Sequence, residues 1–312
     1  MSTVKNKNSN QAIIVAGIGE VLWDIVGRQE TLGGAPVNFA FNAAQLGASA
    51  YAISAVGDDG RGNRAIKLLQ NKSIDVDYVQ KTTQQTGYVL ADTDDNGIAT
   101  YRFPDNVAWD NLTLNPAVCQ LIEKLDVICF GSLAQRSQTT RETIYHYLTL
   151  ASNEQEKHQA SINTLKVFDL NIRQNFYSRK IIERSLQFAN VLKLNDDELV
   201  LMQRLFALKG SQEEQLKQLL NDYGLSLIAL TRGEKGSMLV TANEVSEHAG
   251  FRCQVVDTIG AGDAFTAGVV MGLLKGLSLA QINHQANYIA SYVCQQAGAM
   301  NDIPKNVISE LY

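Results

Sequence analysis

The chain has 312 residues, of which 45% are hydrophobic and 19% are charged, and its formal net charge is −5. These values are typical of a soluble globular protein with a substantial core, and the acidic balance argues against a nucleic-acid-binding protein, which needs a basic face. No apolar run approaches the ~20 residues needed to cross a bilayer, and residues 1–11 are polar, without the apolar core of a secretion signal. We therefore expect a cytoplasmic protein with no membrane or nucleic-acid partner and a flexible tail at residues 1–11.

From residue 12 onward, short apolar runs alternate with segments of helical spacing. Strands interleaved with helices imply parallel βαβ units with helices on both faces of the sheet. Ligands of such sheets gather at the carboxyl ends of the strands. The patterns predict strands at 12–17, 51–56, 126–130, 166–170, 191–194 and 225–230. They predict helices at 35–46, 61–70, 139–151, 180–190 and 212–223.

Residues 86–104 interrupt this alternation. Two strand-like runs, 87–90 and 98–103, flank the sequence Asp-Asp-Asn-Gly at 94–97, and an Asn-Gly turn between such runs is a strong hairpin signal. We expect this hairpin to form a separate small sheet, with residues 22–32 supplying its other strands. Because no Pro- or Ser-rich linker is present, the pattern favours one domain at 12–312 with lid segments near 22–32 and 86–104.

Residues 257–263, Asp-Thr-Ile-Gly-Ala-Gly-Asp, lie directly before an apolar helix that begins near Ala264. Gly260 and Gly262 let the backbone approach a ligand closely, and the free amides and the dipole at a helix start attract a phosphoryl group. Asp263 is placed to accept a proton from an attacking hydroxyl. An Asp in the first turn also stabilises a helix by itself, but three small residues between two carboxylates exceed what a cap needs. The segment therefore indicates phosphoryl transfer.

Further polar residues follow the predicted strands. Asp24 can accept two hydroxyl hydrogen bonds, which suits a polyol, although an ordinary turn Asp is the alternative. Arg173, after the predicted strand at 166–170, can neutralise charge on a triphosphate or reach a substrate. Residues 17–19, Gly-Ile-Gly, are not a dinucleotide-binding fingerprint, because Leu22 stands where the third glycine belongs. An NAD-dependent enzyme is therefore disfavoured.

Residues 257–263 as a whole resemble the C-terminal signature of the PfkB-type sugar kinases, the ribokinase-like family. This resemblance implies a ribokinase-like three-layer α/β/α fold with a mostly parallel central sheet and a small β lid. Four separated matches occur in the expected order and extend it over nearly the whole chain. In that family the last Asp of the signature is the catalytic base and the small residues before it form the anion hole, roles that fall here on Asp263 and on Gly260, Ala261 and Gly262.

Residues 33–38, Gly-Gly-Ala-Pro-Val-Asn, are similar to the N-terminal motif of the same family. By themselves they form a glycine loop with a good helix start, since Pro suits a first helical turn. The resemblance assigns sugar-hydroxyl binding to Gly33, Gly34 and Asn38, and it gives Asp24 the role of holding the sugar. The Gly-Gly-Ala-Pro variant is similar to fructokinases. Arg102 in the lid departs from the expected fructokinase sequence, and an anionic acceptor would give it a partner.

The resemblance also implies a site for ATP and Mg²⁺. Residues 231–236 are similar to a segment that contacts ATP phosphates, with the contacts falling on Thr231, Gly233 and Gly236. Asn195 and Glu198 match an Asn-x-x-Glu element that organises magnesium, Glu198 acting through water; both also fit a capping box. Asn287 aligns with a position beside adenine. Asp257 and Ile259 match positions that bind an activating monovalent cation such as K⁺ in some members, and whether this chain keeps that site is left open.

We therefore expect an ATP-dependent sugar kinase that phosphorylates a small-molecule sugar, with fructose preferred. The alternatives are another sugar or sugar acid, such as ribose or 2-keto-3-deoxygluconate, then a nucleoside kinase or a catalytically silent sugar-binding module. The oligomeric state stays open, with a homodimer through the lid as one option.

Overall fold

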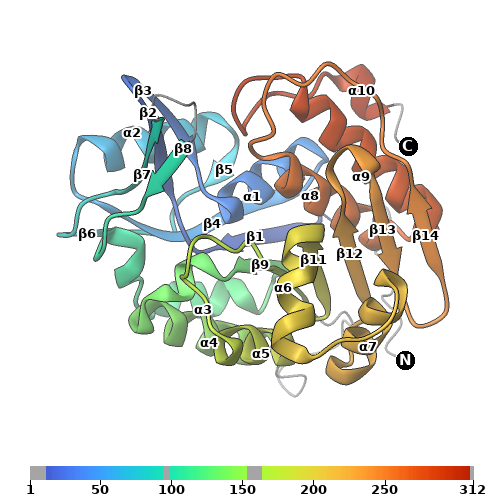
Figure 1. Ribbon diagram of the computed structural model, residues 1–312. Helices are drawn as coiled ribbons and strands as arrows, with labels where there is room; N and C mark the ends of the chain where they lie inside the picture. The colour runs from blue at the N-terminus through green and yellow to red at the C-terminus, as the bar shows by residue number, and fades with distance from the viewer. Residues whose placement is uncertain (1–11, 94–98, 153–163, 310–312) are drawn as a thin grey trace.

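A large, mostly parallel sheet forms the centre of the computed structural model, which describes residues 12–93, 99–152 and 164–309 (Figure 1). The predicted tail at 1–11 and the hairpin turn at 94–97 lie outside these residues. The sheet has ten strands in the order β14-β13-β12-β11-β10-β9-β1-β4-β5, with β6 beside β4, and of these β13 alone runs in the opposite direction to the others. The strands are β1 (Ile14–Ile18), β4 (Ser49–Gly57), β5 (Ile74–Asp75), β6 (Val79–Thr82), β9 (Val127–Gly131), β10 (Leu165–Asp169), β11 (Val191–Asn195), β12 (Leu227–Thr231), β13 (Ser237–Val240) and β14 (Val245–His248).

Helices cover both faces of this sheet, which makes three layers and confirms the predicted α/β class. Alternating side chains of a strand face opposite sides, and β9 shows the consequence. Ile128 and Phe130 pack in one apolar cluster with α4 and α5, whereas Val127 and Cys129 pack in another with α1, α8 and α9. The helices are α1 (Ala35–Gln45), α2 (Gly60–Asn71), α3 (Pro116–Ile122), α4 (Gln138–Ser152), α5 (Arg179–Phe188), α6 (Asp196–Phe206), α7 (Gln212–Tyr223), α8 (Ala261–Leu274), α9 (Leu279–Cys294) and α10 (Lys305–Ser309).

A second sheet of four strands forms the lid, at the upper left of Figure 1. Its strands, in the order β3-β2-β7-β8, are β2 (Leu22–Val26), β3 (Gln29–Gly33), β7 (Gly87–Thr93) and β8 (Ala99–Arg102). Strands β7 and β8 pair antiparallel, as the hairpin pattern predicts. Asp24 lies in the middle of β2 opposite Thr31, inside the segment 22–32 from which strands of the small sheet are expected. This residue therefore belongs to the lid.

None of the helices in the described part of the chain combines the length and apolar character needed to span a membrane.

Candidate active site

Helix α8 begins at Ala261, three residues before the predicted start at Ala264, so Asp263 lies inside the helix and not in the loop before it. Gly260, which precedes the helix, adopts a conformation that other residues rarely reach. Its φ is +78°, and a Cβ at this position would lie 2.6 Å from Cβ of Ala299. The first helical hydrogen bond runs from the amide of Ala264 to the carbonyl of Gly260 at 2.9 Å, and the amide of Ala261 donates to Thr258 at 3.3 Å. The amides of residues 262 and 263 precede regular helical bonding, so they are the free donors of this end.

Asp263 lies in this first turn and contacts the opposite end of the chain. The amide Nδ2 of Asn38, in α1, donates to its Oδ2 at 2.8 Å. Burial raises the pKa of Asp263 to about 6, and the nearby charge of Asp169 adds to the effect. Lys193, the Asn38 hydrogen bond and Arg173 oppose the rise. A carboxyl group with this pKa is ionised at neutral pH and can accept a proton from a hydroxyl.

A second carboxyl group, that of Glu20, is buried beside the glycine loop. Its Oε1 accepts from the amide of Ala35 at 3.3 Å and from Nδ2 of Asn171 at 3.4 Å. Because Gly34 caps α1 without a side chain, Glu20 supplies the acceptor that the helix start lacks. Glu20 is only 1% exposed, and burial raises its pKa to about 7, with Asp263 as a further cause.

Two buried acceptors around this loop have no protein partner. Among the described residues, Oε2 of Glu20 and Oδ1 of Asn38 accept no hydrogen bond. Buried polar atoms are nearly always paired in native proteins, so such atoms at a predicted binding site point to a polar ligand. A sugar supplies hydroxyl donors of the required kind. The residues present therefore fit a polyol.

Asp24 reaches the same region from the lid. Its Oδ2 lies 2.7 Å from the position that a Cβ on Gly33 would occupy, which explains why the loop has glycine there. Burial raises the pKa of Asp24 to about 6, against the attraction of Arg173. A Cβ on Gly34 would lie 2.3 Å from the carbonyl oxygen of Glu20. The carboxylate of Asp24 and the glycine loop thus lie side by side, and sugar binding by them stays a prediction.

The two predicted arginines differ in position. Arg173 is exposed, and its charge lowers the pKa values of Asp24, Glu20 and Asp263. Arg102 lies in β8, where its side chain is also exposed, and it is not among the causes of those three shifts. Arg173 is therefore the arginine that acts electrostatically on the predicted sugar site.

Asn195 and Glu198 form a complete capping box at the start of α6. Asn195 Oδ1 accepts from the amide of Glu198 at 2.8 Å, and Glu198 Oε2 accepts from the amide of Asn195 at 2.9 Å. Glu198 Oε1 accepts from the amide of Ile172 at 2.8 Å. Each carboxylate oxygen has a second lone pair, so the arrangement leaves room for a magnesium-bound water and fits the predicted indirect role. No group of three or more His, Cys, Asp or Glu side chains suited to a metal occurs among the described residues.

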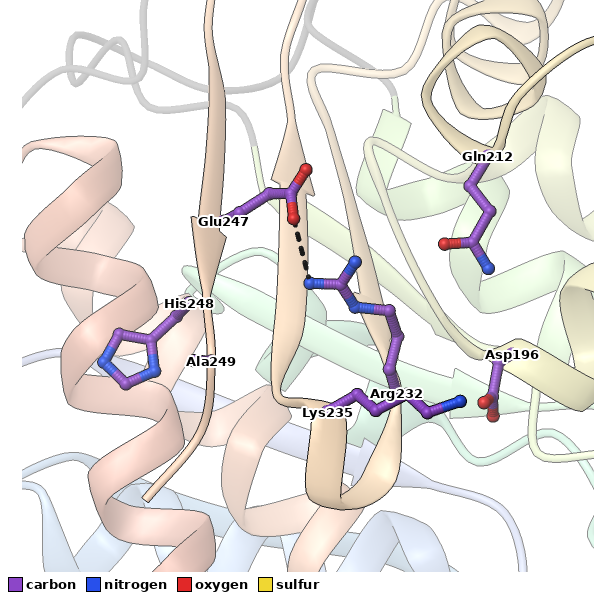
Figure 2. A pocket seen from close by; sticks show the side chains of 7 residues that line it. All are labelled: Asp196, Gln212, Arg232, Lys235, Glu247, His248 and Ala249. Carbon is purple, nitrogen blue, oxygen red and sulfur yellow. Dashed lines mark hydrogen bonds and ion pairs between the residues drawn. The ribbon is translucent and has the colours of Figure 1, made fainter. Parts of the chain in front are cut away.

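The predicted phosphate loop, residues 231–236, borders a cavity of about 540 Å³ (Figure 2). Gly233 and Gly236 have φ values of +56° and +78°, and a Cβ on Gly236 would lie 1.9 Å from the carbonyl oxygen of His248. Figure 2 shows Arg232 directed at Glu247, an ion pair of 3.2 Å. The residues lining the cavity are Asp196, Gln212, Arg232, Lys235, Glu247, His248 and Ala249.

The side chains of Asn287 and Asp257, predicted to lie near adenine and a monovalent cation, have protein partners. The amide Nδ2 of Asn287 is buried in α9 and donates to Ser237 Oγ at 2.7 Å and to the carbonyl of Asn283 at 2.7 Å. Asp257 accepts from the amides of Ile259 at 2.9 Å and Gly298 at 3.0 Å. Both residues thus have a structural role, and their predicted adenine and cation contacts remain predictions.

Sequence reasoning missed three charged residues close to Asp263. Glu20 lies behind the glycine loop, and Asp169 and Lys193 pair at 3.1 Å between adjacent strands. A signal was present, because a lysine within the apolar strand β11 cannot be buried without a partner. The sequence did not show which carboxylate that partner is.

A helix start with free amides, a buried carboxylate with a raised pKa and unpaired acceptors beside the glycine loop are compatible with a kinase that acts on a polyol. The pfkB family of carbohydrate kinases matches residues 14–306. The chain therefore belongs to that family, and the predicted ribokinase-like fold is confirmed.

Several known proteins are similar to this chain over most of their length. An ATP-dependent 6-phosphofructokinase of Thermoanaerobacterium thermosaccharolyticum is 27% identical, with 96% of this chain and 93% of that protein covered. A fructokinase of Escherichia coli is 27% identical over 87% of this chain and 88% of that protein. The crystal structure of a sugar kinase of Pyrococcus horikoshii in complex with ATP has a TM-score of 0.79 and 25% identity, covering 96% of this chain and all of that one (100%).

Proposed function

We propose that this carbohydrate kinase transfers the γ-phosphoryl group of ATP to a hydroxyl of fructose, giving fructose 6-phosphate and ADP. The observation that carries the proposal is the hydrogen bond between Asn38 and Asp263. It joins the helix that follows the predicted sugar loop to the carboxylate at the anion site. A sugar held by the loop and a phosphoryl group held at the start of α8 would thereby lie next to each other.

In this reaction Asp263 accepts the proton of the attacking hydroxyl, and the amides at the start of α8 stabilise the charge that develops on the transferred group. Asp24 and Asn38 orient the sugar through its hydroxyl groups. Catalysis of this kind depends mainly on positioning and electrostatics. Closure of the lid sheet over the sugar would exclude water and limit hydrolysis of ATP.

Glu198 and Asn195 would hold Mg²⁺ through water, and the loop at 231–236 would hold the phosphates of ATP. The metal neutralises charge on the phosphates when bound. The ATP complex of the Pyrococcus horikoshii sugar kinase supports the choice of donor. We also propose that K⁺ binds at Asp257 and Ile259. Both carboxylate oxygens of Asp257 already accept one amide hydrogen bond each, so the cation would use their remaining lone pairs.

The charges around the sugar site favour a neutral acceptor. Asp24, Glu20 and Asp263 converge there, and Arg173 is the cation that acts on all three. Recognition of an anionic sugar needs an excess of Arg or Lys donors. The carboxylates of Asp24 and Asp263, with part of a charge from Glu20, give the opposite balance, because Lys193 is already paired with Asp169. This supports fructose over fructose 6-phosphate, although a 6-phosphofructokinase is among the relatives.

A panel of acceptors tests the proposal. ATP consumption is measured with fructose, ribose, fructose 6-phosphate, 2-keto-3-deoxygluconate and a nucleoside, each also with the Asp263→Asn variant to correct for background hydrolysis. We expect fructose to give the highest kcat/KM. If another acceptor has a higher kcat/KM than fructose, that acceptor is the substrate and fructose is not. If pure protein turns over none of the acceptors, a catalytically silent sugar-binding module is favoured.

The reaction is consistent with action in the cytoplasm, where ATP is abundant. We also propose a homodimer formed through the lid, because Val26 of β2 is 55% exposed and Tyr101 of β8 is 53% exposed on this small sheet. Light scattering of the wild-type protein and of a Val26→Asp variant would show whether the lid carries such a contact.

A further inference from the structure

The strand β11 carries a lysine at its centre. Its sequence is Val-Leu-Lys-Leu-Asn, and Lys193 is only 8% exposed. Moving an ammonium group out of water is costly unless it is paired with a charge. A buried lysine within an apolar strand therefore has a reason for being there, and the reaction described above does not yet use it.

Lys193 lies directly behind the predicted anion site. Its Nζ is 3.1 Å from Oδ1 of Asp169 and 2.9 Å from the position that a Cβ on Gly262 would occupy. The other oxygen of Asp169 accepts from Oγ1 of Thr266 at 3.3 Å, one helical turn beyond Asp263 in α8. The lysine and its carboxylate thus sit against the inner side of the turn that carries the catalytic carboxylate.

Charged and titratable groups face Asp263 from every neighbouring element. Glu20 follows β1, Asp169 and Arg173 come from β10 and the loop after it, and Lys193 comes from β11. The buried thiol of Cys129, in β9, is the fifth group, and its pKa lies well above the usual value. The ammonium group of Lys193 is paired with Asp169 at 3.1 Å, and a buried ammonium group with such a partner stays charged.

We propose that Lys193 is a positioning residue that balances the charge of Asp169 and thereby keeps Asp263 ionised and ready to accept the sugar proton. The inference rests on the proposed function for its catalytic meaning. Its electrostatic content stands on the contacts of Lys193 with Asp169 and Gly262, and on the hydrogen bond from Thr266 in α8 to Asp169. Neither residue needs to touch the sugar or the nucleotide for this role.

Removal of the ammonium has a definite consequence. Two buried carboxylates that face each other without a countercharge cannot both ionise readily, and they come to share a proton. In a Lys193→Met variant, Asp263 would then be protonated for part of the population at a pH where it is ionised in the wild type. Removal of Asp169 alone should lower the pKa of Asp263, because Asp263 loses a neighbouring negative charge and keeps the positive charge of Lys193.

The first experiment reads the ionisation directly. Protein without nucleotide or sugar, with ¹³C-labelled aspartate carboxyl groups, is titrated by NMR, and the signal of Asp263 is assigned by its loss in Asp263→Asn. We expect the midpoint of Asp263 to move up by about one pH unit in Lys193→Met, the size typical of coupled carboxylates. We expect it to move down in Asp169→Asn and to return near the wild-type value in the double variant. An unmoved midpoint in both single variants overturns the proposal.

The second experiment reads catalysis. The acidic limb of the pH profile of kcat/KM, measured with the best acceptor, should move to higher pH in Lys193→Met and to lower pH in Asp169→Asn. It should lie near the wild-type position in the double variant Lys193→Met/Asp169→Asn. Lys166→Met is the matched control, because Lys166 is a lysine of equal exposure, 8%, near the other end of the adjacent strand β10, and its limb should stay in place. A purely structural role would lower kcat at all pH values and make the double variant worse than either single one.

The outcomes separate the two proposals. If the wild-type protein phosphorylates no sugar, the proposed function fails, and the NMR titration still decides the role of Lys193. If the wild type is active but no limb moves, the role of Lys193 fails and the kinase assignment stands. Should Lys193→Met not fold, as judged by its thermal transition, the downward shift in Asp169→Asn and the return in the double variant still decide the question.

Discussion

The side-chain amide of Asn38 donates a 2.8 Å hydrogen bond to Oδ2 of Asp263, although 225 positions separate the two residues in the chain. Asn38 lies one turn into α1 and Asp263 lies in the first turn of α8, and these two helices pack side by side on the same face of the sheet. The bond fixes one carboxylate oxygen, and we expect the other to accept the sugar proton. The orientation of the base thus depends on the helix that carries the sugar loop.

Replacement of Asp263 by Asn keeps the size of the side chain and removes its ability to accept a proton. We expect kcat to fall by at least ~10²-fold, the lower range for loss of a general base, with little change in the KM for ATP. Steady-state kinetics measure both values. Asp126→Asn is the control, because this buried carboxylate accepts from the amide of Ile14 and lies at the amino end of the central strand β9, whereas Asp169 beside Asp263 lies at the carboxyl end of β10. Near-normal turnover in Asp263→Asn would remove the residue from the mechanism.

The raised pKa of Asp263 predicts how stability and activity depend on pH. Since its pKa is about 6 in the folded state against 3.8 for the free group, the folded state binds more protons between these values. The free energy of unfolding contributed by this group therefore decreases as pH rises through that window. Asp263→Asn should raise the melting temperature at pH 8, and the gain should vanish below pH 4. The activity of the wild type should fall as pH drops through about 6. A variant less stable than the wild type at pH 8 would contradict the raised pKa.

Asp24 is predicted to bind the sugar rather than the nucleotide. In Asp24→Ala, the sugar hydroxyls lose charged acceptors that are each worth roughly 1.5–3 kcal/mol, so the KM for the sugar should rise by about 10- to 100-fold. The KM for ATP should change little, because the residue lies in the lid strand β2 beside Gly33. Asp24→Asn keeps the shape and should show a smaller effect. A rise confined to the KM for ATP would place Asp24 in another site.

The sequence predicted the parts of this site that depend on local chemistry. The glycines at 33, 34 and 260 and the carboxylate of Asp263 could be placed because unusual backbone conformations and helix starts leave a readable local pattern. The apolar runs predict the strands, and the alternation with helices predicts parallel pairing. The order of the strands in the sheet could not be predicted from these patterns. Features set by neighbouring residues could therefore be predicted, whereas contacts between residues far apart in the sequence could not.

The residues that sequence reasoning missed are those defined by distant partners. Glu20 acts on Asp263 because β1 lies two strands from β10 and because α1 is packed against α8, and neither relation can be read from nearby residues. The sequence of β11 indicates that the buried Lys193 needs a charged partner. The register of β10 and β11 identifies that partner as Asp169.

The acceptor itself gives the sharpest remaining prediction. Asp24, Glu20 and Asp263 outweigh Arg173 around the sugar site, and an anionic group placed there would be repelled. Fructose should therefore exceed fructose 6-phosphate and 2-keto-3-deoxygluconate in kcat/KM.

Arg102 tests this conclusion from the other side, because it is the lid cation that an anionic acceptor would use. Its side chain is exposed in β8, so Arg102→Ala should lower kcat/KM for fructose by no more than about threefold, within the range of a surface substitution. Arg28→Ala, an exposed arginine between β2 and β3, is the matched control and should behave in the same way. Faster turnover of either anionic acceptor, together with a collapse of that activity in Arg102→Ala but not in Arg28→Ala, would replace fructose as the substrate. The kinase chemistry at Asp263 would be unaffected by that result, since the two arginines lie in the lid and not at the start of α8.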